Sequence, residues 1–403
     1  MGIPSHTIII LLSCVVILSY LFNLISRKTN IPSVLLLIAT GVGIQYSTRY
    51  YGLDQLDVSK LVNILGAVGL IMIILEAALD LDVHKGKYKL IGNSFFSALF
   101  VFIISALTIG FLIMKWLDEP FSKAFLYAVP LSIISSAIVI PSTASLPEFK
   151  KEFIIYESSF SDIIGILVFN YMIMQNLFSL NTAFAFAGNV VLAVLISLVS
   201  SLLMLYILSK TEVNIKFFLV FAILSVVYAS GELIHLPSLL IVLVFGLVLN
   251  NSPRVIKGRM LRLIPTDNLE GILDVMKSIT AETSFLIRTF FFILFGYTIQ
   301  LPVLILPSVW EIGTCIVLIL LLVRFLYLRI ILRANLFPEL FLMPRGLVTI
   351  LLFYSIPAEK SMSSFSEGIL FFVVVITSLL MIIGLLFFNK EKYKYYERED
   401  KFI

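Results

Sequence analysis

An acidic residue stands inside an apolar helix in the segment ESSFSDIIGILVFN, residues 157–170. Asp162 is followed there by uncharged, mostly apolar sequence up to the next loop. A carboxylate within a membrane-spanning helix costs several kcal/mol, so it is interpreted first as a functional residue with a partner. Ser158 lies four residues earlier on the same helical face, where its hydroxyl can share a ligand with the carboxylate.

Further charged residues within apolar spans indicate ion pairing. Glu157 lies about 140° around the helix from Asp162, so one acid of this helix can be structural while the other works. An unpaired buried ion would neutralise itself or unfold its helix, which favours pairs of opposite charge. The complete set is Glu76, Glu157, Asp162, Arg288, Arg324 and Arg345.

Three of these positions also have a purely structural interpretation. Asp162 could be an acid buried against Arg288. Glu76 lies just before two aspartates and could belong to a solvated helix end. Arg345 could be a packing cation with no chemical role.

The composition places these residues in a membrane protein with many spans. Of 403 residues, 60% are hydrophobic and only 13% are charged, and the mean hydropathy is +1.07. That much apolar surface excludes a water-soluble globule. The net charge of +4 would suggest a nucleic-acid partner only in a soluble protein. Here Lys and Arg lie mainly in short loops, so we expect no nucleic-acid partner.

Neither the cysteines nor the N-terminal segment indicates further chemistry. Cys14 and Cys315 lie far apart in apolar runs, which argues against a disulfide framework or a metal cluster. The first apolar run, about residues 5–24, has no basic region before it and no small-residue cleavage site after it. We therefore expect a retained helix rather than a signal peptide. We also expect no cofactor.

Apolar stretches of spanning length, separated by Pro, Gly or charges, predict about thirteen membrane helices. Of the 29 Lys and Arg residues, 21 fall on one side, five on the other and three within spans. The positive-inside rule then predicts an outer N-terminus and a cytoplasmic C-terminus. The stretches lie at roughly 5–24, 31–47, 60–80, 90–114, 121–146, 153–178, 184–209, 216–234, 236–250, 283–300, 305–330, 341–357 and 367–388.

Two pairs of similar segments predict an inverted repeat. IPSVLLLIATGVGIQYS (31–47) and LPSLLIVLVFGLVLNNS (236–252) share Pro-Ser-x-Leu and a glycine at the same offset, in the second and ninth helices. An odd separation in helix number means that the copies cross the membrane in opposite senses. SIISSAIVIPSTASLPE (132–148) and LFLMPRGLVTILLFYSIPAE (340–359) are the matching interrupted spans. This plan is typical of secondary transporters with a binding site near the midplane.

Five segments carry motifs in chain order: IILEAALDLD (73–82), SSAIVIP (135–141), ESSFSD (157–162), LLVRFLYL (321–328) and MPRGLVTILLFYSIP (343–357). They resemble the third, broken fifth, sixth, eleventh and twelfth helix segments of the monovalent cation:proton antiporter superfamily, the sodium/proton exchanger family. The likeness covers nearly the whole chain. It implies an all-α polytopic membrane protein, about thirteen transmembrane helices in an inverted-repeat antiporter fold with two broken, crossing helices.

The resemblance also implies roles for individual residues. Asp162 would alternately hold a proton or a cation. Glu157 would pair with Arg324 to stabilise a moving core. Arg345 would lie near the second broken helix, where it can offset carbonyl dipoles at a half-helix C-terminus. Further cation ligands would come from Ser158, Ser161, Glu76 and the broken helix near Ser135 and Ser136.

Departures from the family pattern bear on stoichiometry. Ser161 precedes Asp162 where the family has Asn or Asp, and Ser135-Ser136-Ala137 replaces Thr-Asp-Pro. In the family, a single working aspartate goes with electroneutral one-for-one exchange. We therefore expect electroneutral exchange of H⁺ for Na⁺, with K⁺ or Li⁺ as alternatives, and we expect Glu76 to stay ionised.

The resemblance further implies a homodimer in a prokaryotic plasma membrane. A channel, or a transporter of another substrate, stays open as an alternative. An intramembrane group-transfer enzyme is less favoured, because no histidine lies within a span and most loops are short.

We expect the chain to form a single transporter domain made of several parts. These parts are scaffold helices at 1–80 and 216–300, a core bundle at 90–178 and 305–388, a linker helix at 184–209, a cytoplasmic connector at 251–282 and a short basic tail at 389–403.

Overall fold

The computed structural model is helical throughout the part of the chain that it describes. That part is residues 5–29, 32–50, 59–81, 85–143, 146–173, 180–210, 217–234, 236–256, 269–333 and 336–388, and it contains no strand. The predicted tail 389–403 and residues 257–268 of the predicted connector lie outside the described residues.

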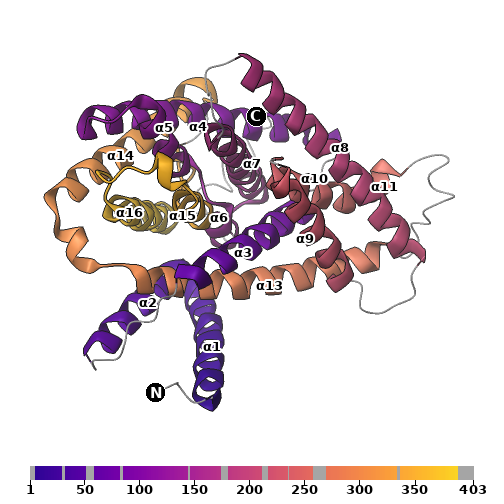
Figure 1. Ribbon diagram of the computed structural model, residues 1–403, viewed down its shortest axis with the longest axis horizontal. Helices are drawn as coiled ribbons and strands as arrows, with labels where there is room; N and C mark the ends of the chain where they lie inside the picture. Colours follow the sequence, from indigo (N-terminus) through magenta and orange to yellow (C-terminus); the bar gives the residue numbers. More distant parts are fainter. Residues whose placement is uncertain are drawn as a thin grey trace. The chain divides into compact units, whose positions relative to one another are not determined.

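The helices follow the apolar stretches of the sequence (Figure 1). They are α1 Ser5–Thr29, α2 Ser33–Tyr50, α3 Ser59–Asp80, α4 Tyr88–Leu117, α5 Phe121–Ser132, α6 Ser136–Ser142, α7 Glu148–Ile173, α8 Leu180–Lys210, α9 Phe217–Leu233, α10 Ser238–Asn250, α11 Ser252–Val255, α13 Leu269–Thr298, α14 Pro307–Leu326, α15 Leu347–Tyr354 and α16 Glu367–Leu386. Short helical turns are η1 Lys85–Lys87, η2 Leu301–Ile305, η3 Tyr327–Ile331 and η4 Ala358–Lys360.

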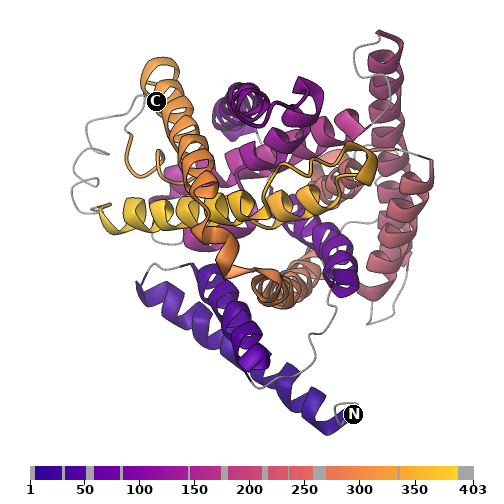
Figure 2. The same cartoon turned by 60° about the vertical axis from the view of Figure 1, so that its left-hand side comes forward.

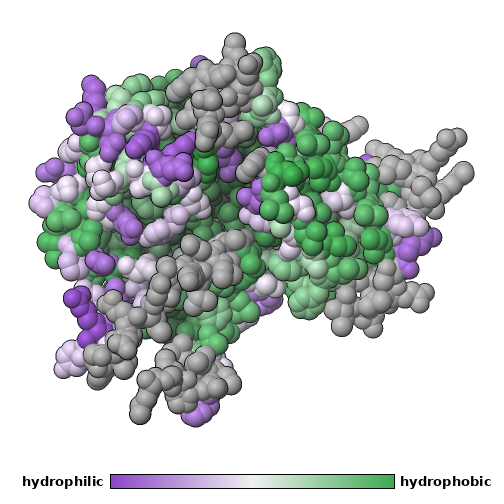
Figure 3. All heavy atoms as spheres, in the orientation of Figure 1, coloured by the Kyte–Doolittle hydropathy of each residue, from purple (hydrophilic) through white to green (hydrophobic). Residues whose placement is uncertain are grey.

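Six helical segments of the described chain are long and apolar enough to cross a membrane. They are Tyr88–Leu117, Phe121–Ser142, Phe184–Lys210, Gly271–Thr298, Pro307–Ile331 and Glu367–Leu386. Apolar side chains also cover the surface over α8 and α9 (Figure 3), where Val199 and Phe218 are each 67% exposed. Such faces are suited to lipid hydrocarbon, in which the helical backbone satisfies its own polar groups. The chain is therefore an integral membrane protein.

The first of two compact units holds Met1–Val62, Lys89–Gly165 and Thr289–Ile403. Within it α1 packs on α2, α5 packs on α15, and α14 packs on α16. Figure 2 shows α16 passing across α14. This unit contains Asp162 and every residue that contacts its carboxylate in the described chain.

The second unit holds Asn63–Tyr88 and Ile166–Arg288. Within it α10 packs against α8 and α9, and Ser197 Oγ donates a hydrogen bond to the carbonyl of Ile241 (2.7 Å). The side-chain amides of Asn250 and Asn251 both donate to the carbonyl of Leu81 (2.9 and 3.1 Å). The end of α3 is thereby joined to the end of α10.

An interruption separates α5 from α6. Residues 133–135 leave the helix, and Ile133 and Ser135 have extended backbone with ψ of 130° and 113°. Two β-branched isoleucines and three serines, whose hydroxyls compete for backbone hydrogen bonds, favour such an extended stretch in the sequence SIISS.

The second predicted interruption, 340–359, differs from the first. A non-helical stretch at 342–346 precedes α15, so only residues 347–354 of this span form an α-helix. The Ser135 N–H donates to the carbonyl of Pro344 (2.9 Å), which brings the two non-helical stretches into contact.

Candidate functional site

The Asp162 carboxylate is buried in α7 and has two different oxygens. Asp162 is only 5% exposed. Its Oδ2 accepts hydrogen bonds from the hydroxyl of Ser136 (2.5 Å) and from the backbone N–H of Ser136 (3.2 Å). Its Oδ1 is buried and has no hydrogen-bond partner among the described residues. One oxygen is thus fixed in place, and the other is open to a ligand.

The helix interruption supplies the donors that hold this carboxylate. In lipid, backbone groups freed from a helix need other partners, because no water is available to them. Three consecutive N–H groups, of the two residues before α6 and of its first residue, donate to acceptors in neighbouring segments. The acceptors are Ser161 Oγ for Ile134 (2.9 Å), the Pro344 carbonyl for Ser135 (2.9 Å) and Asp162 Oδ2 for Ser136 (3.2 Å). Ser161 and Asp162 therefore act together as a cap on the broken helix.

Arg345 satisfies the carbonyl groups on the other side of the interruption. Its Nε donates to the carbonyl of Leu131 (2.9 Å) and its Nη2 to that of Ser132 (3.2 Å), both at the C-terminal end of α5. Its Nη1 donates to the carbonyl of Met343 (2.5 Å). The sequence placed Arg345 near the second broken span. Two of the carbonyls that it binds belong instead to the first, where its charge complements the helix C-terminus.

The remaining serines of the predicted site have different surroundings. Ser135 Oγ is buried without a described hydrogen-bond partner, as is the hydroxyl of Thr349 on α15. Ser158 Oγ donates to the carbonyl of Ile155 within its own helix (3.2 Å) rather than to Asp162. Its role as a cation ligand stays a prediction.

Gly165 allows the interruption to approach α7 closely. A Cβ at this position would lie 2.3 Å from Cγ1 and Cδ1 of Ile133, well inside contact distance. Gly165 is three residues after Asp162 and so lies near the same face of α7. The absence of a side chain here sets how near the broken helix comes to the carboxylate.

A second acid of α7 forms a buried ion pair. Arg324 Nη2 and Nη1 donate to Glu157 Oε2 (2.7 Å) and Oε1 (3.1 Å), and both side chains are at most 1% exposed. Ser97 Oγ donates to the same Oε1 (2.5 Å). Arg324 Nε also donates to the carbonyl of Glu339 (2.6 Å). This guanidinium therefore joins α14 to α7 and to the segment that leads into α15.

A second buried ion pair was not predicted from the sequence. Lys150 Nζ contacts Glu339 Oε1 and also donates to the carbonyl of Phe337 (3.3 Å). Each of the two residues lies just outside an apolar stretch, so neither belongs to the set of charged residues expected within spans. The signal that could have found them is a lysine seven residues before Glu157, on the same face of one helix.

Glu76 belongs to the second unit and pairs there with Arg288. Arg288 Nη1 and Nη2 donate to the two carboxylate oxygens of Glu76 (3.0 and 3.3 Å), and the two side chains are 15% and 17% exposed. Arg288 was considered as the partner of Asp162, and it instead contacts a different acid. Glu76 is accordingly not a freely solvated helix end.

The oxygen-rich character of the site suits a small hard cation rather than a transition metal. No group of three or more His, Cys, Asp or Glu residues that could hold a metal ion occurs in the described part of the chain. The oxygen atoms described at the interruption include the Asp162 carboxylate and the hydroxyls of Ser136 and Ser161, which are hard ligands.

Comparisons with known proteins agree with this chemistry. The family described as "Sodium/hydrogen exchanger, transmembrane" matches residues 11–388. No curated protein sequence matches the chain. Among solved structures, the chain is similar to the sodium proton antiporter MjNhaP1 from Methanocaldococcus jannaschii at pH 8, with 19% identity and a TM-score of 0.65 over 94% of this chain and 95% of that one. An electron microscopy map of the same antiporter gives 18% identity and a TM-score of 0.68 over 95% of each chain. At these identities the similarity shows the fold.

Proposed function

Because the chain belongs to the sodium/hydrogen exchanger family, we propose that it exchanges Na⁺ for H⁺ across the membrane at Asp162. K⁺ and Li⁺ are the alternative cations. The observation that carries the proposal is the asymmetry of this buried carboxylate, since Ser136 fixes Oδ2 while Oδ1 has no described partner. A proton or a monovalent cation can then occupy the open oxygen, but not both at once.

The further cation ligands are proposed from the residues around the helix interruption. Ser135 is the strongest of them, because its hydroxyl is buried without a described partner. The remaining proposed ligands are Ser136, Ser158, Ser161 and Glu76. Ser136 can coordinate a cation through a lone pair of its hydroxyl while it still donates to Asp162, and rotation of the Ser158 hydroxyl would free that oxygen to face the cation.

Transport follows from competition combined with alternating access. In this mechanism the site opens to one side at a time, and neither ion crosses without being replaced by the other. The Glu157–Arg324 pair would keep the core rigid as it moves, and Arg345 would hold the interrupted helix in shape. The proposed architecture has about thirteen membrane-crossing helices in an inverted repeat. We also propose a homodimer in a prokaryotic plasma membrane, with the N-terminus outside.

Proton-coupled cation flux in proteoliposomes tests the proposed function. Wild-type protein should couple an imposed Na⁺ gradient to a change in internal pH, and Asp162→Asn should abolish that coupling. Asp118→Asn is the matched control, because Asp118 is an exposed aspartate outside the site. Near wild-type exchange by a folded Asp162→Asn variant would refute the mechanism. Repeating the assay with K⁺ and Li⁺ decides the cation.

The stoichiometry has its own test. If Asp162 is the one acid that exchanges its proton, and Glu76 keeps its pairing with Arg288 throughout the cycle, one H⁺ is exchanged for one cation. Exchange should then be insensitive to an imposed membrane potential. A potential of 100 mV biases each uncompensated charge by about 2.3 kcal/mol, so even one net charge per cycle would be visible. Flux that follows the potential would point to Glu76 as a second titrating group.

A further inference from the structure

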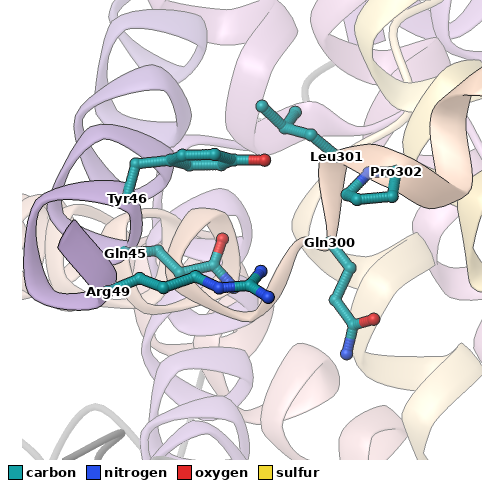
Figure 4. Close-up of a pocket in the computed structure, with 6 residues that line it drawn as sticks. All are labelled: Gln45, Tyr46, Arg49, Gln300, Leu301 and Pro302. Carbon is teal, nitrogen blue, oxygen red and sulfur yellow. The ribbon is translucent and has the colours of Figure 1, made fainter. Parts of the chain in front are cut away.

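A polar pocket at the end of α2 lies apart from the exchange site in the sequence and in its residues. It has a volume of about 230 Å³ and is lined by Gln45, Tyr46, Arg49, Gln300, Leu301 and Pro302. Figure 4 shows the side chains of α2 reaching toward the Gln300–Pro302 segment. None of the proposed ligands of the transported cation lines it.

The helices α2 and α13, whose ends border this pocket, cross closely at two glycines. A Cβ on Gly41 would lie 2.1 Å from the carbonyl oxygen of Ile293, and one on Gly296 would lie 2.2 Å from that of Ile38. The backbones of α2 and α13 are therefore in contact at this point. Glycines permit such a close approach of two helix backbones within a membrane.

Side chains on one stripe of α2 form a wall of the pocket. Gly41, Gln45 and Arg49 follow one another at intervals of four residues, so they share one helical face. Gln300, just after the end of α13, lies four residues beyond Gly296 on the opposite side.

Two polar groups of the pocket have no partner in the described part of the chain: the exposed guanidinium of Arg49 and the buried Oε1 of Gln45. Arg49 is the one charged residue among the six that line the pocket, and it pairs with no carboxylate among the described residues. A guanidinium matches the oxygens of a phosphate group, to which the Tyr46 hydroxyl and the Gln300 amide can also donate. Gln45 Oε1 is buried and has no described hydrogen-bond partner. It needs a donor, which a bare anion without N–H or O–H groups does not offer.

The position of the pocket favours a lipid as the source of that phosphate. Arg49 lies in the last turn of α2, the helix end that the distribution of basic residues predicts to face outside. Tyr46 is 42% exposed and Tyr50 is 85% exposed at the same helix end. Tyrosine and arginine with an apolar stem are typical of the headgroup level of a bilayer.

We propose that this pocket binds the phosphate of a phospholipid whose headgroup carries a hydrogen-bond donor. Arg49 holds the phosphate, and Gln45 Oε1 accepts from the headgroup hydroxyl or ammonium. The bound lipid would join the ends of α2 and α13 above their glycine crossing. This inference holds independently of which cation the protein exchanges.

Thermal stability of the full-length protein in detergent tests the proposal. Added dioleoylphosphatidylglycerol should raise the Tm of wild-type protein, whereas dioleoylglycerol, which has the same chains and no phosphate, should not. In Arg49→Gln the concentration of phosphatidylglycerol for half of the stabilisation should rise at least about tenfold, since a charge-assisted hydrogen bond is lost. Arg49→Lys should keep part of the response, which preserves the test if the Gln variant folds poorly.

Lys115→Gln is the matched control, because Lys115 is an exposed cation in the last turn of α4 and does not line the pocket. It should respond to the lipid like wild type. If dioleoylglycerol stabilised the protein equally, the phosphate group would not be what the pocket recognises. If inorganic phosphate stabilised it equally, the ligand would not need to be a lipid. An unchanged response in Arg49→Gln would overturn the site.

Discussion

Ser136 donates two hydrogen bonds to a single oxygen of Asp162, one from its hydroxyl and one from its backbone N–H. The backbone bond exists only because the helix is interrupted just before Ser136, which leaves that N–H without an intrahelical acceptor. The interruption and the buried carboxylate therefore stabilise each other. This arrangement leaves the second oxygen of Asp162 without a described hydrogen-bond partner.

Replacing Ser136 by alanine should weaken cation binding without abolishing exchange. The backbone N–H would still bind Oδ2, but one of the two donors that orient the carboxylate would be gone. A hydrogen bond to a charged group contributes about 1.5–3 kcal/mol, so the half-saturating cation concentration should rise roughly tenfold or more. Flux measured against cation concentration checks this. Ser136→Thr retains a hydroxyl and should behave like wild type, and equal behaviour of the two variants would contradict the role of the hydroxyl.

The Glu157–Arg324 pair should show strong energetic coupling. Glu157→Gln or Arg324→Met alone leaves an uncompensated buried charge and should cost about 3–5 kcal/mol of stability. The double variant should cost less than the sum, because it removes both charges together. Thermal unfolding of the two single variants and the double variant measures the coupling. Additive losses would show that the two side chains do not act as a pair.

Gly165 should tolerate a methyl group only if Ile133 becomes smaller. Gly165→Ala introduces a Cβ that would lie 2.3 Å from Cγ1 and Cδ1 of Ile133, and overpacking of this kind costs about 1–3 kcal/mol. The broken helix would be displaced from Asp162, so exchange should fall together with stability. Ile133→Ala removes the two colliding atoms and should restore both in the Gly165→Ala background.

If Ile133→Ala rescued neither property, the loss in Gly165→Ala would not be caused by the contact with Ile133. Gly188→Ala serves as the matched control, because a Cβ at Gly188 meets nothing within 4 Å. It should leave both exchange and thermal stability close to the wild-type values.

Glu339 should make stability depend on pH. Burial raises the pKa of the Glu339 carboxyl above its ordinary value of 4.5, although the Lys150 ammonium acts in the opposite direction. The folded protein then keeps this proton to a higher pH than the unfolded chain does. From about pH 4.5 upward, the free energy of unfolding should therefore fall as pH rises, by at most about 1.4 kcal/mol per pH unit, until the raised pKa is passed.

Glu339→Gln cannot titrate and should lack this part of the pH dependence. Comparing the Tm of wild type and variant between about pH 4 and pH 8 isolates it, because all other groups are shared. Glu148→Gln is the control, since Glu148 is an exposed acid at the start of α7. Parallel pH curves for wild type and Glu339→Gln would be inconsistent with a raised pKa.

The sequence by itself determined the helical membrane character of this protein and its few chemically significant residues. Long apolar runs can satisfy their backbone in lipid only as helices, so hydropathy predicts them directly. The cost of a charge in lipid is enough to single out Asp162, Glu157 and Arg324, because each stands within an apolar run. The SIISS stretch gave a local reason for the interruption after Ser132, because its side chains disfavour continued helix.

Only the tertiary structure decided which of these groups meet. Ser158 was the expected neighbour of Asp162 from helical spacing, but its hydroxyl binds a carbonyl of its own helix, while Ser136 approaches from another segment. Arg288 contacts Glu76 across 212 positions of the chain. Arg345 binds the end of α5 rather than an acid. Local spacing fixes which residues share a helical face, but the partner of a buried polar group is set by packing between segments distant in sequence.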